Sequence, residues 1–242
     1  MVYFYPRFKR KFMPLSGPDT CVSYIYELSC FELLTDEEKE LLNNRSVIVN
    51  YKKGEMVCKQ GSFASHIMYL DKGLVKIYLE GNPKDLILTI TPQKNLMGLQ
   101  SLYEGNNTFL YSIATYTDSV VRLIDIQIFK QLLKQNPLFA YRILNILNES
   151  TSQSYGRFFS LTHKQLHGRL ADILLCLSRK IFKSESFDLP LTRSDLSDLT
   201  SMSTESVIRI MKDFKDDGII DINNKSITLL DMPRLDSISA KG

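Results

Sequence analysis

Short apolar stretches separated by glycines and turn residues dominate the chain from Val47 to about Ile126. They read VIVNY, KKGEMVCKQG, HIMYLDKGLVKIYLEG, NPKDLILTITPQKNLMG and YSIATYTDSVVRLID. Repeated short strands of this kind predict an antiparallel sandwich or roll. Just before them, Thr35 and Glu38 have the spacing of a capping box, which predicts that a short acidic helix, TDEEKELLNN, lies against one end of the roll.

The apolar period becomes helical beyond Ile126, and it predicts one long helix over residues 137–163. Six positions of this helix recur at alternating steps of three and four, which is the a and d spacing of a coiled-coil seam. These positions are Leu144, Leu147, Thr151, Ser154, Phe158 and Leu161. The seam predicts a homodimer, and the small hydroxyl residues weaken its middle. The alternative is that the stripe packs on the roll, a role that Ile143, Ile146 and Phe159 could fill instead.

Two short capped helices and a tight polar turn follow in the segment LTRSDLSDLTSMSTESVIRIMKDFKDDGII. Thr192 with Asp195 has the spacing to cap the first helix, and Ser203 precedes the second. This pattern is typical of a helix-turn-helix. An apolar stripe, Val207, Ile210, Met211 and Phe214, is expected to be buried against the first helix. The segments IIDI and SITLL, joined by an Asn-Asn turn, predict the β-hairpin of a wing.

The outward face of the second helix carries the side chains that a recognition helix presents in the major groove. Arginine can hold guanine O6 and N7 together, and glutamate can accept a hydrogen bond from cytosine N4. Glu205, Arg209 and Lys212 lie on this face and are expected to contact DNA. The other residues expected to contact DNA are Thr204 and Ser206 of the same helix and Thr192 and Arg193 at the start of the first helix. The alternative is that Glu205 only favours the helix dipole and pairs with Arg209 on an exposed helix.

The balance of charged residues bears on the prediction of DNA binding. The formal net charge is +3 and the pI is about 8.5, without the strong basic excess of a nonspecific nucleic-acid coat. From Thr192 to Gly218 there are four basic residues against six acidic ones. Basic residues of the preceding segment, such as Lys164, Arg169 and Arg179, are therefore expected to supplement the attraction for phosphates. A small-molecule-binding or protein-interaction module with a degenerate DNA-binding domain is the alternative.

Other chemistry finds little support in the sequence. The three histidines lie outside recognisable nucleophile or metal motifs, so we expect neither an enzyme nor a metal site. No apolar run approaches the roughly 20 residues that span a bilayer, and the N-terminal stretch lacks a secretory signal, so a cytoplasmic protein without a membrane contact is expected. Four scattered cysteines are expected to be buried, reduced thiols: Cys21, Cys30, Cys58 and Cys176.

From about Phe31 to Leu230 the chain resembles the bacterial Crp/Fnr family of transcription regulators. KKGEMVCKQG and YLDKGLVKIY look like its roll, and LTRSDLSDLTSMSTESVIRI looks like its helix-turn-helix. The resemblance implies an α+β fold with an N-terminal double-stranded β-helix (jelly roll) sensor domain, a long dimerisation helix and a C-terminal winged helix-turn-helix. The implied divisions are a basic flexible tail at 1–20, a cyclic-nucleotide-binding-like effector domain at 21–136, the central dimerisation helix at 137–163 and the DNA-binding domain at 164–242.

The resemblance also implies a homodimer on a palindromic site in double-stranded DNA, with RNA polymerase as a partner. In such members the positions of Glu205 and Arg209 read base edges, and that of Arg193 touches phosphate. Thr204 stands where some members carry a further base-reading arginine. Ser201 replaces a turn glycine that has positive φ in many of these motifs, so modest local strain is expected there.

The effector pocket departs from the cyclic-nucleotide-binding members. Their Gly-Glu-Leu and Arg-Ser signatures are replaced by residues 98–100, GLQ, and 109–112, FLYS, and no lysine or arginine lies between Asn95 and Val121. A buried cyclic phosphate would therefore lack a charge-assisted partner. These departures and the cysteine spacing argue against cAMP, haem or an iron–sulfur cluster, and no cofactor is predicted. The pocket is expected to take an apolar effector or to be filled, and its predicted residues are Gly98, Leu99, Gln100, Ser101, Phe109, Leu110, Tyr111, Ser154 and Tyr155.

Overall fold

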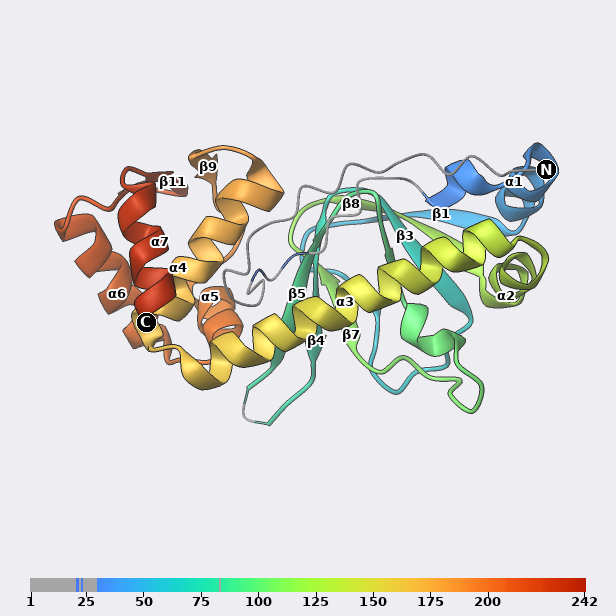
Figure 1. Ribbon diagram of the computed structural model, residues 1–242, viewed down its shortest axis with the longest axis horizontal. Helices are drawn as coiled ribbons and strands as arrows, with labels where there is room; N and C mark the ends of the chain where they lie inside the picture. The colour runs from blue at the N-terminus through green and yellow to red at the C-terminus, as the bar shows by residue number, and fades with distance from the viewer. Residues whose placement is uncertain (1–20, 22, 24–29, 83) are drawn as a thin grey trace, which may run out of the picture.

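The computed structural model describes residues 21, 23, 30–82 and 84–242. The basic tail predicted at 1–20 lies outside these residues. A β-roll occupies one end of the molecule and a small helical domain with a three-stranded sheet the other, and one long helix runs along both (Figure 1). The predicted α+β arrangement of roll, long helix and winged helix-turn-helix is confirmed.

Two four-stranded sheets, antiparallel throughout, form the roll. In spatial order, one contains β1 (Ser46–Tyr51), β8 (Ser119–Asp125), β3 (His66–Lys72) and β6 (Asn95–Met97), and the other contains β2 (Met56–Cys58), β7 (Ser112–Thr115), β4 (Leu74–Leu79) and β5 (Leu86–Pro92). Buried residues such as Leu70 and Ile113 form a core between them. Gly73 makes the turn from β3 to β4 with φ of +108°, and a Cβ there would collide with Ser119.

Short helices close the far end of the roll. They are η1 (Cys30–Leu33), α1 (Asp36–Asn44) and α2 (Ile126–Gln135), and a further 3-10 turn, η2 (Leu99–Leu102), follows β6. The predicted capping box of α1 is present. The Glu38 amide donates to Thr35 Oγ1 at 3.2 Å, and the Thr35 amide donates to Glu38 Oε2 at 2.9 Å.

The long helix, α3 (Pro137–His163), begins with Asn136 as its N-cap and ends at Lys164. Phe139, Ile143 and Ile146 are buried against the roll end of the molecule. Phe159 does not share this role, because it is 38% exposed and stacks on His163. Of the three residues expected to pack on the roll, Ile143 and Ile146 do so and Phe159 does not.

The remaining elements form a winged helix-turn-helix. They are α4 (Leu166–Cys176) with a π-helical continuation η3 (Leu177–Phe182), β9 (Ser186–Asp188), α5 (Arg193–Thr200), α6 (Thr204–Asp216), β10 (Ile220–Asn223), β11 (Ser226–Leu229) and α7 (Met232–Lys241). The predicted hairpin is β10–β11, and β9 adds a third strand beside β11. Ser201, between α5 and α6, has the expected left-handed conformation with φ of +52°. No sequence signal had pointed to α7, which packs on α4.

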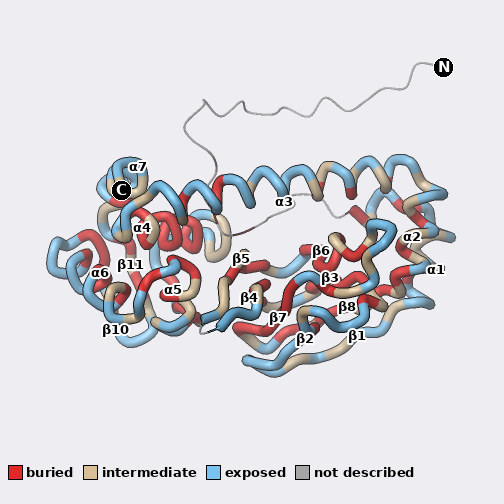
Figure 2. The backbone as a smooth tube through the Cα atoms, turned by 90° about the horizontal axis from the view of Figure 1, so that it is seen from below, coloured by how far each residue is buried: buried red, intermediate tan, exposed pale blue. Residues whose placement is uncertain are grey.

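The helix-turn-helix is docked on the roll, with α5 beside β4 and β5 (Figure 2). One continuous apolar cluster contains side chains of both, among them Ile87 and Ile90 from β5 and Leu196 and Leu199 from α5. Lysines of the roll add polar links, which include a hydrogen bond of 3.0 Å from Lys84 Nζ to the Met202 carbonyl oxygen. The roll and the helix-turn-helix therefore share an interface.

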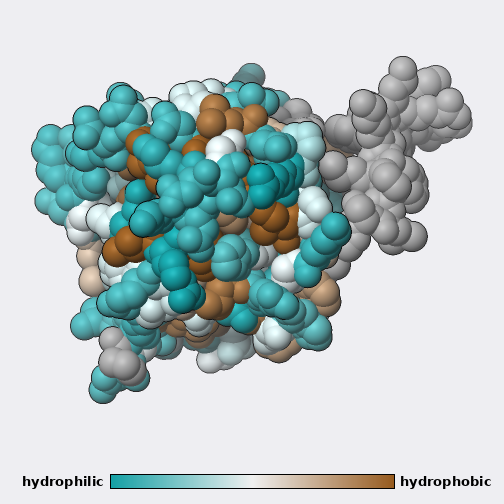
Figure 3. Space-filling model, turned by 90° about the vertical axis from the view of Figure 1, so that its left-hand side faces the viewer, coloured by the Kyte–Doolittle hydropathy of each residue, from teal (hydrophilic) through white to brown (hydrophobic). Residues whose placement is uncertain are grey.

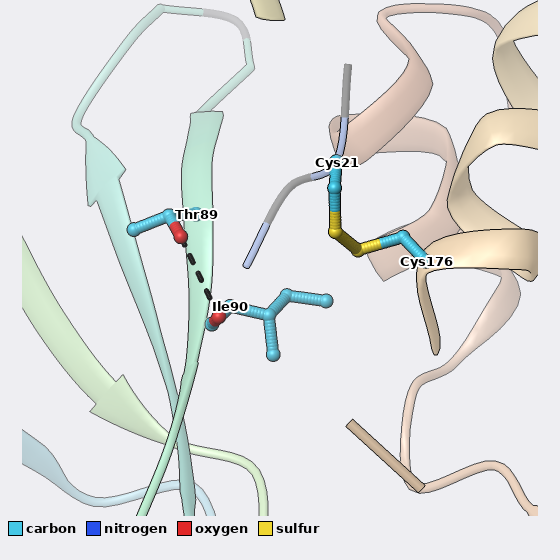
Figure 4. Close-up of a disulfide and its surroundings, with 4 residues drawn as sticks. All are labelled: Cys21, Thr89, Ile90 and Cys176. Carbon is cyan, nitrogen blue, oxygen red and sulfur yellow. Dashed lines mark hydrogen bonds between the residues drawn. A yellow bond between two sulfur atoms is a disulfide. The ribbon is translucent and has the colours of Figure 1, made fainter. Parts of the chain in front are cut away.

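A disulfide also lies between these two parts of the molecule. Cys21 and Cys176 are bonded with their Cα atoms 5.2 Å apart, and the bond sits beside Thr89 and Ile90 of β5 (Figure 4). The prediction of four reduced thiols is wrong for this pair, because Cys21 and Cys176 are 155 positions apart in sequence and only the tertiary structure brings them together. Cys30 and Cys58 are free and buried, and burial raises the pKa of each thiol to about 12.

Candidate DNA-binding face and effector cavity

Helix α6 presents one buried side and one polar side. Val207, Ile210, Met211 and Phe214 are all at most 2% exposed, as their spacing predicts. Burial of this stripe turns Glu205, Arg209 and Lys212 outward, and all three are exposed, while Thr204 and Ser206 are partly exposed. The end of the molecule that bears α6 is largely hydrophilic with scattered apolar patches (Figure 3). Ile208 of α6 is an exposed apolar side chain.

Local hydrogen bonds cap the first turn of α6 and favour the ionised form of Glu205. Ser203 Oγ accepts the Ser206 amide at 3.1 Å and caps the helix. The pKa of Glu205 is lowered, first by its own backbone amide, then by the Ser203 hydroxyl and by the charge of Lys84. Glu205 forms no ion pair with Arg209, so the pairing offered as an alternative is not what orients these side chains. An ionised Glu205 can accept a hydrogen bond from an exposed base edge.

Helix α5 carries the two remaining predicted DNA contacts. Thr192 is exposed and accepts the Asp195 amide at 3.1 Å, as its predicted capping role requires. Arg193 is partly buried, and this desolvation lowers the pKa of its guanidinium. Both residues lie at the N-terminal end of α5, where a helix-turn-helix approaches the phosphate backbone.

The supplementary basic residues expected from the segment before α5 are mostly engaged within the protein. Lys164 Nζ lies 2.8 Å from the buried carboxylate of Asp172. Arg169 donates to the carbonyl oxygens of Lys164 and Thr200, at 2.8 and 3.3 Å. Arg179 forms a two-pronged pair with Asp236. These three side chains are thus engaged in contacts within the protein, which corrects the expectation that they serve mainly to attract phosphates.

A cavity of about 430 Å³ lies between the roll and α3. Five of the nine predicted pocket residues line it: Leu99, Gln100, Leu110, Tyr111 and Ser154. The other four do not. Ser101 and Phe109 are buried outside the lining, Gly98 donates its amide to Tyr111 Oη at 2.9 Å, and Tyr155 is 69% exposed on the outer side of α3. The cavity contradicts the expectation that side chains fill this pocket. The expectation of an apolar effector stays a prediction.

The sequence-based prediction missed the lining residues that the strands contribute and all those of α3 except Ser154. The further lining residues are Ile77, Leu79, Leu86, Leu88, Thr89, Thr91, Asn95, Leu96, Leu147, Ser150, Arg157, Phe158 and Leu161. Arg157 supplies the cation that residues 95–121 lack, and it is only 7% exposed. A signal for it existed, because Ser150, Ser154, Arg157 and Leu161 follow one another at helical steps of four and three.

The predicted seam of α3 divides between two faces. Leu144 and Thr151 are exposed and do not line the cavity, whereas Leu147 and Leu161 line it and are partly buried. Ser154 and Phe158 line the cavity and are also exposed. The outer side instead continues through Tyr141 and Tyr155, which are 59% and 69% exposed. Figure 2 shows this exposed side along the length of the helix. The exposed stripe therefore runs through positions 141, 144, 151, 155 and 158, in steps of three, four and seven, and all but Thr151 are large apolar or aromatic residues.

Two family models match consecutive parts of the chain. The cyclic nucleotide-binding domain matches residues 48–136, and the Crp-like helix-turn-helix domain matches residues 168–238. The chain belongs to the Crp/Fnr family. It is a Crp/Fnr-type transcription regulator with a helix-turn-helix DNA-binding domain.

Relatives within the Crp/Fnr family align over most of the molecule. The cAMP-activated global transcriptional regulator CRP of Salmonella typhimurium is 24% identical over 199 residues, which are 81% of this chain and 95% of that protein. The global nitrogen regulator of a Nostoc species is 24% identical over 76% of this chain and 85% of its own length. The solved structure of FixK2 from Bradyrhizobium japonicum has the same fold, with a TM-score of 0.74 at 19% identity, and covers 81% of this chain and 98% of its own.

Two further observations concern the described part of the chain. Histidine, cysteine and carboxylate side chains gather nowhere in it in a group of three that could hold a metal ion. None of its helices is long and apolar enough to span a membrane.

Proposed function

We propose that this Crp/Fnr regulator acts as a homodimer in the cytoplasm and binds a two-fold symmetric DNA site, with one α6 in each of two major grooves. The observation that carries the proposal is the polar side of α6. Glu205 and Arg209 are exposed, lie within the first two turns and belong to a capped helix whose other side is buried. Residues in these turns of a recognition helix contact base edges.

The outer side of α3 supports the dimer. Tyr141, Leu144, Tyr155 and Phe158 are each more than half exposed, although they are large and apolar or aromatic. A contiguous apolar stripe on a helix marks an interaction surface. Because the stripe has coiled-coil spacing, a second copy of α3 is the partner that matches it best. The pairing would hold the two copies of α6 about one helical turn of DNA apart.

We further propose that the cavity binds an effector other than cAMP and that the DNA-bound dimer contacts RNA polymerase. Half of the described residues that line the cavity are leucine or isoleucine. The segment that replaces the Arg-Ser signature contributes Leu110 and Tyr111 to it, so nothing from that segment would pair with a phosphate. We propose no catalytic role, since the three histidines of the sequence lie outside recognisable nucleophile or metal motifs.

A protein-interaction module without DNA affinity remains the rival function. Its support is the acidic excess of the helix-turn-helix and the docking of α5 on the roll through Asp195 and Asp198. Acidic side chains near the recognition helix repel DNA phosphates unless nearby cations offset their negative charge.

Selection from random duplex DNA distinguishes the two functions. The purified full chain is incubated with the library at low and at moderate salt, with Arg209→Ala alongside. Enrichment of a palindrome by the wild type, with one G·C position relaxed in Arg209→Ala, is the expected result. Failure of the wild type to enrich any sequence, with and without a metabolite extract, would favour the interaction module.

A further inference from the structure

Ile208 is the exception among the apolar residues of α6. The other four, Val207, Ile210, Met211 and Phe214, are at most 2% exposed. Ile208 is 53% exposed, and it is not among the described residues that pack on the apolar cluster shared by the roll and the helix-turn-helix. A half-exposed isoleucine gains little of the free energy that burial gives its four neighbours. Packing within the protein therefore does not account for this residue.

The position of Ile208 is on the side of α6 that bears the expected DNA contacts. It follows Glu205 by three positions and precedes Lys212 by four, and residues at these spacings are neighbours on a helix surface. Arg209 is the next residue in the chain, and all three of these charged side chains are exposed. Isolated apolar residues are common on protein surfaces, so this place among the expected base contacts is what distinguishes Ile208.

The side chain of Ile208 is also held in a defined position. Ser203 Oγ accepts the Ser206 amide at 3.1 Å and caps the turn that precedes Ile208, and the buried Val207 and Met211 fix the rotation of the helix. A branched side chain such as isoleucine has one strongly preferred χ1 rotamer in a helix. A contact made by Ile208 would therefore cost little conformational entropy.

The chemistry of isoleucine limits what it can recognise in the major groove. It has neither a donor nor an acceptor, so it cannot read a base edge through a hydrogen bond. The C5-methyl group of thymine is the apolar group that a base pair presents in this groove. Cytosine at the same place has no methyl group, and its amino group would lose water without gaining a partner. Both effects favour thymine over cytosine beside this side chain.

From these observations we infer that Ile208 contacts the C5-methyl group of a thymine in each half-site and thereby selects a T·A pair there. The inference rests on the proposed function and names a sequence feature that the recognition helix reads. Consecutive residues of a helix rise by about 1.5 Å, whereas stacked base pairs are about 3.4 Å apart. The thymine therefore lies within about two base pairs of the G·C pair assigned to Arg209.

Selection from random duplex DNA, with the full chain and with Ile208→Ala, locates the contact. The wild type is expected to enrich a T·A pair within about two base pairs of the position that Arg209→Ala relaxes. Ile208→Ala should lose the preference for this T·A pair and keep the preference for the G·C pair. Absence of such a T·A pair from the wild-type site, or an undiminished preference for it in Ile208→Ala, would overturn the inference.

Deoxyuridine tests the methyl group itself. It pairs as thymidine does and lacks only the C5-methyl group, and it replaces one thymidine per half-site at a time in the selected duplex. Fluorescence anisotropy should show that the wild type binds about fourfold more weakly per substituted half-site, the effect expected when one methyl group leaves an apolar contact. Ile208→Ala should bind the substituted and the unsubstituted duplex equally. The inference is wrong if the wild type tolerates deoxyuridine at every thymine in this range, or if Ile208→Ala is equally sensitive to it.

Two variants separate this contact from a general loss of binding. Ile208→Val keeps a branched apolar side chain and should remain sensitive to deoxyuridine. Ile48→Ala removes the same side chain as Ile208→Ala, at a position of β1 that is 57% exposed, and should change neither the DNA affinity nor the sensitivity. Because Ile208 is exposed, Ile208→Ala should also keep the urea midpoint of the wild type. Loss of the sensitivity in Ile48→Ala would contradict the assignment to Ile208.

These outcomes distinguish a failure of the inference from a failure of the proposed function. If the wild type enriches no DNA sequence, with and without a metabolite extract, the proposed DNA recognition is wrong and the inference is wrong with it. If the wild type enriches a palindrome but binds it without any dependence on thymine methyl groups, only the inference is wrong.

Discussion

Lys76 of β4 and Asp195 of α5 form an ion pair between the roll and the helix-turn-helix. The Nζ to Oδ1 distance is 3.4 Å, and the two side chains are only 22% and 14% exposed. Lys76 also lies over the rings of Tyr78 and Tyr116. Asp195 additionally completes the capping box of α5, so the same carboxylate begins the helix and fastens it to the roll.

Loss of this pair should loosen the interface. Lys76→Met is expected to lower the free energy of unfolding by roughly 1–2 kcal/mol, because it leaves a partly buried carboxylate without its cation. Urea denaturation followed by circular dichroism measures the change. Lys72→Met, on the exposed end of β3, is the control and should change stability by less than about 0.5 kcal/mol. Equal effects of the two variants would show that the pair contributes nothing specific.

Substitutions of Arg209 and Lys212 should affect DNA binding in different ways. Arg209→Ala is expected to cost about 1–3 kcal/mol on the selected DNA site and to relax the preference at one base pair. Lys212→Ala should weaken all sequences alike and reduce the salt dependence by about one charge. Titration of matched and single-mismatch duplexes at several salt concentrations measures both. An unchanged sequence preference in Arg209→Ala would remove this residue from the recognition surface.

The dimer depends on the outer side of α3. Replacement of Leu144 and Phe158 together by glutamate should give monomers, because two charges would be buried in a pairing of α3 helices. Light scattering measures the mass. The control is Ile48→Glu, at an exposed apolar position of β1 away from α3, which should leave the dimer intact. An intact dimer in the double variant would disprove this interface.

The disulfide should stabilise the oxidised protein. A bond that closes a loop of 155 residues removes chain entropy worth up to about 5 kcal/mol from the unfolded state. Addition of reductant is therefore expected to lower the urea midpoint of the wild type and to leave that of Cys176→Ser unchanged. If the reductant shifts the variant equally, the effect has another origin.

The two free cysteines should be inert in the folded protein. Burial raises the pKa of Cys30 and Cys58 to about 12, so at pH 8 only on the order of one thiol in ten thousand is ionised. Only the thiolate reacts quickly, and reactivity should rise as the pH approaches 12. Labelling with iodoacetamide at pH 8, without reductant, is expected to modify neither cysteine until denaturant is added. Rapid labelling of the native chain would contradict their buried, protonated state.

Local signals in the sequence sufficed for the elements themselves. The alternation of apolar residues predicts the strands of the roll, and the caps at Thr35, Thr192 and Ser203 begin helices where they were expected. The exposed face of α6 follows from the spacing of its buried stripe. These features depend on residues within a few positions of one another, where periodicity and hydrogen bonding to the neighbouring backbone decide the structure.

Tertiary structure alone decided how these elements face one another. On α3, Leu144 and Leu147 have equally suitable spacing, yet the packing of Ile143 and Ile146 on the roll turns the first outward and the second toward the cavity. The same orientation brings Arg157 into the cavity lining. Lys164 pairs with the buried carboxylate of Asp172. Cys176 is bonded to Cys21, which lies 155 positions away in the sequence. A linear sequence specifies the faces of each helix, but which face is buried depends on surfaces contributed by residues far away in the chain.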